Sequence, residues 1–266
     1  MDIVFVGAGR LATQLAKALH RKGEHIVAVY SRTMASAEAL CRMVGGKPCD
    51  SIDALPHRAD AFIVAIKDSA LAGIIPQLTA GRQQCAFFHT AGSVPMSVFG
   101  EVPHHGVIYP MQTFSKERDV DFSRVHLFIE SSDEPTLSLA RAIASTVSSS
   151  VSELSSEERR YLHLAAVFAC NFANHCYTLA ADILEQHGMD FGAMLPLIEE
   201  TAQKASTMHP RDAQTGPAVR YDENVIEAQR QLLAGNPLMQ EVYTLMSRSI
   251  HQHAQTATTI SPQKES

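Results

Sequence analysis

The chain has 266 residues, of which 45% are hydrophobic and 19% are charged, a composition that is typical of globular proteins and excludes a disordered chain. Its 22 Lys and Arg residues against 28 Asp and Glu residues give a formal net charge of −6, and without a basic run we expect no nucleic-acid partner. The 5 cysteines are odd in number and lack Cys-x-x-Cys spacing, which predicts reduced thiols, a cytoplasmic protein and no metal site. The apolar N-terminal run is too short for a signal peptide.

The chain opens with an apolar, β-branched run that leads into a glycine-rich motif and then into an amphipathic segment. The motif consists of Gly7, Ala8, Gly9, Arg10, Leu11 and Ala12. Gly7 permits a tight turn, Gly9 lets the backbone approach a pyrophosphate, and Ala12 keeps the following helix close to the sheet. A helix that starts here offers free N–H groups to phosphates. We therefore predict that all six residues bind a dinucleotide; a purely structural turn is the alternative.

Residues 1 to about 150 alternate short apolar runs with helical patterns, which is typical of a parallel sheet with crossover helices. The predicted strands are 2–6, 25–30, 60–66, 84–88, 105–109 and 125–130. The predicted helices are 9–22, 34–44, 69–80, 94–99 and 134–146. We therefore predict an α/β fold, a Rossmann-type doubly wound parallel sheet that forms an NADP-binding domain over residues 1–153.

From Ser155 on, only helical patterns occur, and Ser155 with Glu158 forms a capping box. The first helix is predicted to run to Gly188, and residues 162–181 contain no charged side chain. Its polar residues would need partners in a bilayer, so we expect no membrane span. We expect a central helix packed by its own domain and by a second copy of the chain. Further helices are predicted at 190–207, 222–234 and 237–253, before a loose tail from about residue 256. Residues 154–266 are thus predicted to form an all-α dimerisation and substrate domain.

The residues after the second predicted strand indicate which nucleotide is bound. NAD-binding folds place an acidic residue there to hold the ribose 2′-hydroxyl. This chain has Ser31, Arg32 and Thr33 and no carboxylate. A guanidinium flanked by hydroxyls suits a 2′-phosphate, so we predict NADP(H) as the cofactor. A solvated surface arginine is the alternative.

The loops after the later strands meet at the same edge of the predicted sheet, where open α/β sheets bind ligands. Asp68 in one of these loops is expected to cap a helix. The predicted cofactor contacts there are Ile66, Lys67, His89 and Thr90. The predicted catalytic residues are His89 and Ser93, and Gln112 and Thr113 are predicted to contact the substrate. For each residue, loop structure and helix capping are the alternative.

The central helix supplies further candidates. At about 100° per residue, His163 and Asn174 lie on one polar stripe of an otherwise apolar helix, and Asn171 lies just beside it. The stripe is satisfied either by packing partners or by a ligand in a crevice, because buried polar groups need partners. The second reading makes the three residues catalytic candidates. Thr215 lies in a predicted turn between two helices, and Arg220 follows shortly after this turn. We predict that both bind the substrate, with an exposed salt bridge as the alternative for Arg220.

Several of these motifs together resemble a bacterial family assigned as NADP oxidoreductases, which have a Rossmann-like domain followed by a helical domain of unassigned function. The family is similar in plan to pyrroline-5-carboxylate reductase, to β-hydroxyacid dehydrogenases and to the NADP-binding domain of F420-dependent NADP reductase. The motifs are residues 7–12, 89–92, 110–114, 161–168 with Asn171, and 215–217. The resemblance implies a helical domain that forms a homodimer and an active site between the two domains.

The chain departs from its relatives at two positions. Tyr109 stands where relatives often carry His, so no role for that imidazole can be transferred. The catalytic Lys of β-hydroxyacid dehydrogenases has no match, and His163 is the nearest candidate.

We hypothesise an NADP(H)-dependent oxidoreductase that transfers a hydride between the nicotinamide and a small C=O or C=N substrate. A proton must reach the substrate heteroatom, and His163 is the first choice for its donor, ahead of His89. A non-catalytic NADP(H) sensor or partner protein is the alternative, favoured by the missing Lys. A third reading, hydride exchange with a deazaflavin, rests on fold analogy.

Overall fold

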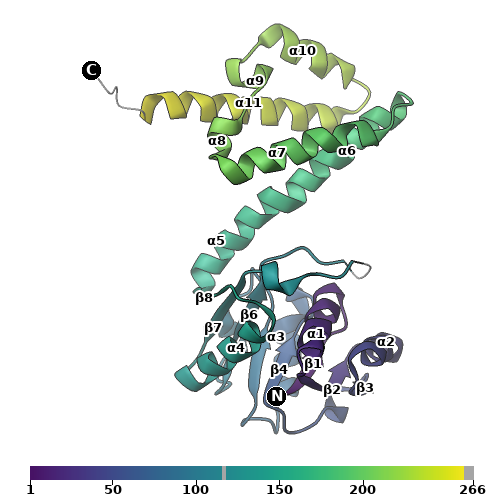
Figure 1. Cartoon of the computed structure of the whole chain (residues 1–266), viewed down its shortest axis with the longest axis vertical. Coiled ribbons are helices and arrows are strands. Elements are labelled where there is room, and N and C mark those ends of the chain that lie inside the picture. The colour runs from purple at the N-terminus through teal and green to yellow at the C-terminus, as the bar shows by residue number, and fades with distance from the viewer. Residues whose placement is uncertain (116–117, 261–266) are drawn as a thin grey trace. The chain divides into compact units, whose positions relative to one another are not determined.

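The computed structural model describes residues 1–115 and 118–260 (Figure 1). The chain divides into two compact units, one of residues 1–172 and one that begins at Ala173. The predicted division after residue 153 stays a prediction.

A sheet of eight strands forms the centre of the first unit. In spatial order the strands are β3 (Lys47–Cys49), β2 (His25–Tyr30), β1 (Asp2–Val6), β4 (Ala61–Val64), β5 (Ala86–His89), β6 (His105–Pro110), β7 (Leu127–Ser131) and β8 (Val151–Glu153). Strands β1 to β6 pair in parallel, which confirms the Rossmann-type prediction. The strand order reverses between β1 and β4, and the crevice outside the carboxyl ends of strands at such a switch point is the usual ligand site.

The last two strands differ from the predicted all-parallel sheet. β7 pairs antiparallel with β6, and β8 pairs parallel with β7. The reason is the β6–β7 connection, whose described part contains only the short 3-10 helix η3 (Phe122–Arg124) and no crossover helix. Strands β3 and β8 were not predicted, because each is an edge strand of three residues and carries too few side chains for a hydrophobic pattern.

Helices cover both faces of this sheet (Figure 1). The helices are α1 (Arg10–Arg21), α2 (Met34–Val44), α3 (Asp68–Thr79) and α4 (Glu134–Val147), with the 3-10 helices η1 (Ile52–Ala54) and η2 (Met96–Phe99). Alternate side chains of β1 point to opposite faces: Ile3 and Phe5 belong to the core packed by α1, α2 and α4. Val4 and Val6 belong to the core packed by α3. Burial on both faces explains why these strands are continuously apolar.

The helix predicted from Ser155 to Gly188 has three parts: α5 (Ser156–Ala166), the π-helical segment η4 (Val167–Phe172) and α6 (Ala173–Gln186). The capping box is confirmed, because the Ser155 hydroxyl accepts from the Glu158 N–H and the Glu158 carboxylate accepts from the Ser155 N–H. The π segment was not predicted. Because a π-helix closes its hydrogen bonds over five residues, a constant 100° per residue does not hold between His163 and Asn174. The predicted polar stripe is therefore broken.

The second unit is helical, as predicted. Beyond α6 it contains η5 (Phe191–Met194), α7 (Leu195–Thr207), α8 (Pro210–Ala213), α9 (Pro217–Arg220), α10 (Glu223–Leu232) and α11 (Pro237–Ile260). The predicted loose tail is wrong as far as Ile260, and beyond that it lies outside the described residues.

Very little of the helical region is buried within one chain. Among the described side chains from residue 160 to residue 256, only Met239 and Ser247 are buried. The expectation that the central helix is packed by its own domain is therefore wrong. Within the described part of the chain, no helix is long and apolar enough to cross a membrane.

Candidate active site

A cavity of about 890 Å³ lies in the first unit, at the carboxyl ends of five parallel strands. Its walls come from the glycine loop after β1, the turn after β2, the loops after β4 and β5, and the end of β6. Helix α5 contributes His163. The cavity therefore occupies the place where open α/β sheets bind their ligands.

The glycine loop fits a phosphate group. Gly7 has a φ of +119°, and a Cβ there would lie 2.3 Å from the Ala65 carbonyl oxygen, so no other residue fits. At Gly9 a Cβ would meet nothing within 4 Å, which leaves open space beside the start of α1. The first turn of α1 has no acidic residue and no capping side chain. Free N–H groups beside open space suit a pyrophosphate. Ala12, by contrast, is fully buried in the core and is not part of the cavity wall.

The turn after β2 places a guanidinium and hydroxyls in the cavity wall. Ser31, Arg32 and Thr33 all line the cavity, together with Ser36, whose hydroxyl accepts a hydrogen bond of 2.8 Å from the Thr33 hydroxyl. Arg32 forms no ion pair with any residue that the structure describes. The turn thus presents an uncompensated positive charge with several hydroxyl donors, the groups that bind a phosphate monoester.

A phenol and an imidazole meet in the part of the cavity wall that lies at the end of β6. The hydroxyl of Tyr109 lies 3.0 Å from Nδ1 of His163, and the two rings meet edge to face. A Cβ on Gly92 would lie 2.4 Å from His163 Nδ1 and 3.0 Å from Tyr109 Cε2, so only glycine allows this approach. Burial raises the pKa of Tyr109 above the ordinary value of 10.0, so the phenol is protonated at neutral pH, as an exposed tyrosine is too.

Tyr109 was missed by sequence reasoning, which asked only whether the residue matched the histidine of its relatives. The signal that could have found it is a phenol at the carboxyl end of a buried parallel strand, where side chains face the ligand crevice. Its partner His163 comes from a helix 54 positions further along the chain, and no local pattern predicts that contact.

Asp68 is the only carboxylate among the residues that line this cavity. Its Oδ2 accepts a hydrogen bond of 2.6 Å from the Ser93 hydroxyl, which joins the start of α3 to the loop after β5. The predicted capping role of Asp68 is wrong: Lys67 is the N-cap of α3 and makes no side-chain cap. Ser93 lies outside the cavity wall and reaches it only through Asp68.

His89 does not reach the cavity. Its ring is fully buried at the end of β5, stacks on Phe99, and accepts at Nδ1 from the Ala91 N–H at 3.1 Å. Burial, helped by the positive charge of Arg159, lowers the pKa of His89 to about 4. A neutral, sealed imidazole can neither hold a nucleotide nor exchange protons with a substrate, so the prediction for His89 is corrected.

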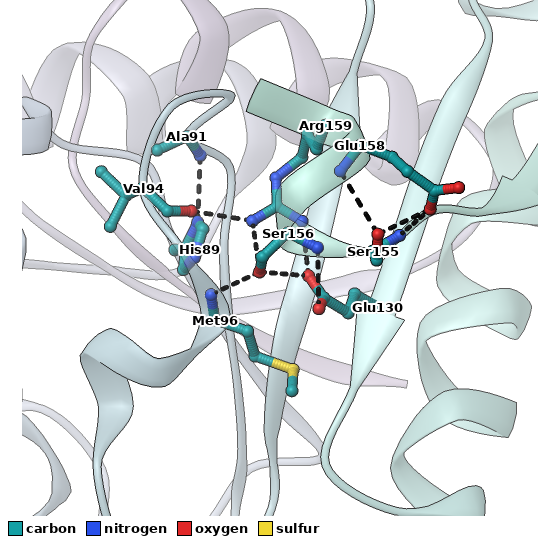
Figure 2. Close-up of polar contacts among 9 residues, drawn as sticks. All are labelled: His89, Ala91, Val94, Met96, Glu130, Ser155, Ser156, Glu158 and Arg159. Atoms are coloured by element: carbon teal, nitrogen blue, oxygen red, sulfur yellow. Dashed lines mark hydrogen bonds and ion pairs between the residues drawn. The ribbon is translucent and has the colours of Figure 1, made fainter. Parts of the chain in front are cut away.

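A buried ion pair fastens the first turn of α5 to the sheet (Figure 2). Arg159 is fully buried and donates from Nη1 to Glu130 at 2.5 Å and from Nη2 to the Val94 carbonyl at 2.7 Å. The Ser156 hydroxyl donates to Glu130 at 2.7 Å and accepts from the Met96 N–H at 2.8 Å. These contacts join α5 to β7 and to the loop after β5. They hold the helix one turn before His163. The sequence did not predict them, because an arginine in the first turn of a helix is usually exposed.

The other predicted site residues fall into three groups. Those that line the cavity are Gly7, Ala8, Gly9, Arg10, Leu11, Ile66, Lys67, Thr90 and Gln112. Outside this cavity, Thr113 bonds to the Gln112 side chain, and Asn171 is exposed on η4. Asn174, Thr215 and Arg220 belong to the second unit. Among the described residues, no group of three or more His, Cys, Asp or Glu could hold a metal ion.

The sheet order, the glycine loop and the cavity define a dinucleotide-binding protein of the Rossmann type. A family model described as a Rossmann-like domain matches residues 1–113. A second model, described as a domain of unknown function (DUF2520), matches residues 125–250.

The crystal structure of a putative NADP oxidoreductase from Bacteroides fragilis is 51% identical, covers 94% of this chain and 98% of its own, and has a TM-score of 0.91. The chain therefore belongs to the same family as the Bacteroides fragilis protein.

Two more distant structures share the fold. A protein from Thermotoga maritima is 24% identical over 95% of this chain and 99% of its own, with a TM-score of 0.78. An imine reductase from Myxococcus stipitatus, in complex with NADP⁺, is 15% identical over 97% of this chain and 94% of its own, with a TM-score of 0.69. No curated protein matches the chain.

Proposed function

We propose that this protein is an NADP(H)-dependent oxidoreductase that transfers a hydride between the nicotinamide and a small C=O or C=N compound. One observation carries the proposal: the glycine loop, which suits a phosphate group, and the Tyr109–His163 pair line the same cavity. The similarity to the putative NADP oxidoreductase from Bacteroides fragilis, at 51% identity, supports it.

The chain's own residues would hold the cofactor at its pyrophosphate and at its 2′-phosphate. The N–H groups at Gly9 and the start of α1 bind the pyrophosphate, and Arg32 with its flanking hydroxyls binds the 2′-phosphate. Ile66, Lys67 and Thr90 also line the cavity and are proposed as further contacts. When bound, NADPH supplies the hydride, which neither a side chain nor the backbone can provide.

His163 supplies the proton that must reach the product heteroatom. It lies in the cavity wall on α5, and the ring nitrogens of an imidazole can both donate and accept a proton. Gln112, also in the wall, is proposed to bind the substrate. The roles predicted for Ser93, Thr113, Asn171, Asn174, Thr215 and Arg220 remain proposals.

The test is NADPH oxidation, followed by absorbance, with a panel of small probes: 1-pyrroline, 2-methyl-1-pyrroline, pyruvate, glyoxylate and acetoacetate. We expect the wild type to reduce at least one probe. His163→Ala should lower turnover at least about tenfold and leave NADPH affinity nearly unchanged, since the side chain acts on the proton. His20→Ala is the matched control, because His20 is exposed at the end of α1 and outside the cavity wall.

Two outcomes would overturn parts of the proposal. Tight NADPH binding without reduction of any probe would favour the sensor reading over the enzyme. Wild-type turnover in His163→Ala, with an active probe, would remove His163 from the mechanism.

We further propose that the chain works in the cytoplasm as a homodimer formed by a helical domain of residues 154–266. The support for a dimer is the apolar surface that one chain leaves uncovered, which includes Leu238 and Leu245 on α11. The support for the compartment is that the cysteines of the described chain form no disulfide.

A further inference from the structure

We infer that Tyr109 is a further catalytic residue, which donates the proton to the substrate heteroatom and recovers it from His163. The inference rests on the proposed function and deepens it, because it names the group that touches the substrate.

The geometry places the phenol and the imidazole side by side in the cavity wall. Tyr109 and His163 both line the cavity, and their polar atoms lie 3.0 Å apart. In the described structure, His163 Nδ1 is the only hydrogen-bonding partner of the Tyr109 hydroxyl, so the second position on this oxygen is available to a ligand. The absence of a side chain at Gly92 creates the space in which the two rings meet.

The environment keeps the phenol in the form that can donate. Burial is the largest influence on the Tyr109 pKa and raises it above the ordinary value of 10.0, at which a phenol is already protonated at neutral pH, so the hydroxyl is available as a donor once a stronger base forms beside it. Hydride addition creates such a base, because the π electrons of C=O or C=N move onto the oxygen or nitrogen.

The proposed transfer balances in protons and electrons. The heteroatom takes the proton from Tyr109 Oη as the O–H bond breaks, and the phenolate takes the Nδ1 proton of the His163 imidazolium. Neutral His163 then regains a proton from water. The sum consumes one NADPH and one proton for each C=O or C=N bond reduced, and leaves Tyr109 and His163 unchanged.

The experiment compares wild type, Tyr109→Phe, His163→Ala and the double variant at saturating NADPH, with whichever probe of the panel the wild type reduces. Tyr109→Phe keeps the ring that packs beside Gly92 and removes only the hydroxyl. Tyr161→Phe is the matched control, because it loses the same group from the same helix as His163 but is 69% exposed and lies outside the cavity wall.

We expect Tyr109→Phe to lower turnover at least about tenfold, with NADPH affinity within about twofold of the wild type. Because the two residues act in one relay, the double variant should be no slower than the slower single variant. Tyr161→Phe should keep wild-type turnover.

Each other outcome decides against the inference. Wild-type turnover in Tyr109→Phe removes the phenol from the mechanism and leaves the proposed function standing. Losses that multiply in the double variant show that the two residues act independently, which contradicts a relay. If the wild type reduces no probe, the proposed function fails first, and the inference falls with it.

Discussion

His89 is fully buried at the end of β5, and the fold sets its charge. Its pKa is lowered to about 4 from an ordinary 6.5, first by burial and then by the positive charge of Arg159. Above pH 6.5 the imidazole is neutral in both the folded and the unfolded chain, and its contribution to stability is complete. Between pH 6.5 and 4 only the unfolded chain binds the proton, so the free energy of unfolding falls as the pH falls. The shift corresponds to a loss on the order of 3 kcal/mol.

We therefore expect His89→Asn to weaken this pH dependence. Asparagine keeps an acceptor for the Ala91 N–H but does not titrate in this range. Urea unfolding at pH 7 and at pH 5 should show a smaller loss of stability in the variant than in the wild type. His20→Asn, at an exposed site, should keep the wild-type dependence. Equal slopes in His89→Asn and the wild type would show that His89 is not the titrating group.

Among single residues, the sequence predicted those whose chemistry depends on neighbours along the chain. The glycine loop was predictable because a tight turn, a helix start and a phosphate site are all encoded within six residues. Tyr109 was not, because its role depends on His163, which only the folded chain brings near. Arg159 and Glu130 pair across 29 positions, and burial of an arginine cannot be inferred from its own helix.

Among the elements, the interior parallel strands β1, β2, β4, β5 and β6 were predicted well, because each has a clear apolar pattern. The errors follow from contacts that the pattern does not contain. β7 runs antiparallel to β6 because the described part of the β6–β7 connection contains no crossover helix. The π segment η4 interrupts the helix within residues 162–181, a stretch without a charged side chain. The network of Arg159 and Glu130 fixes the first turn of α5 (Figure 2).

The exposed faces of the helical elements lead to a prediction about assembly. No residue of α6, α7 or α10 is buried, and Leu238 and Leu245 lie two turns apart on α11 at 71% and 66% exposure. A second copy that covers these faces would remove their apolar surface from water. Sedimentation equilibrium should therefore give about twice the chain mass of 29.0 kDa.

A pair of substitutions tests which face forms the dimer. Leu238→Glu combined with Leu245→Glu should shift the equilibrium toward the monomer, because two charges would be buried without partners. Met43→Glu, at a 48% exposed apolar residue of α2 in the first unit, should leave the dimer intact. A wild-type monomer at all concentrations would contradict the homodimer proposal.

For the whole molecule, we place the nicotinamide nucleotide site in the first unit. Every residue that lines the cavity lies between Gly7 and His163, within residues 1–172. The Rossmann-like match over residues 1–113 covers the glycine loop and the turn that holds Arg32. Binding of the nucleotide can therefore be measured without any knowledge of the substrate.

The most direct measurement is a calorimetric titration of the full chain with NADPH and with NADH, for the wild type, Arg32→Ala and the control Arg42→Ala. Arg42 is an exposed arginine of α2 outside the cavity wall. We expect micromolar binding of NADPH that weakens at least about tenfold in Arg32→Ala, or roughly 1.4 kcal/mol, while NADH binding and Arg42→Ala change little. If the wild type binds no nicotinamide nucleotide, the account of the cavity is contradicted.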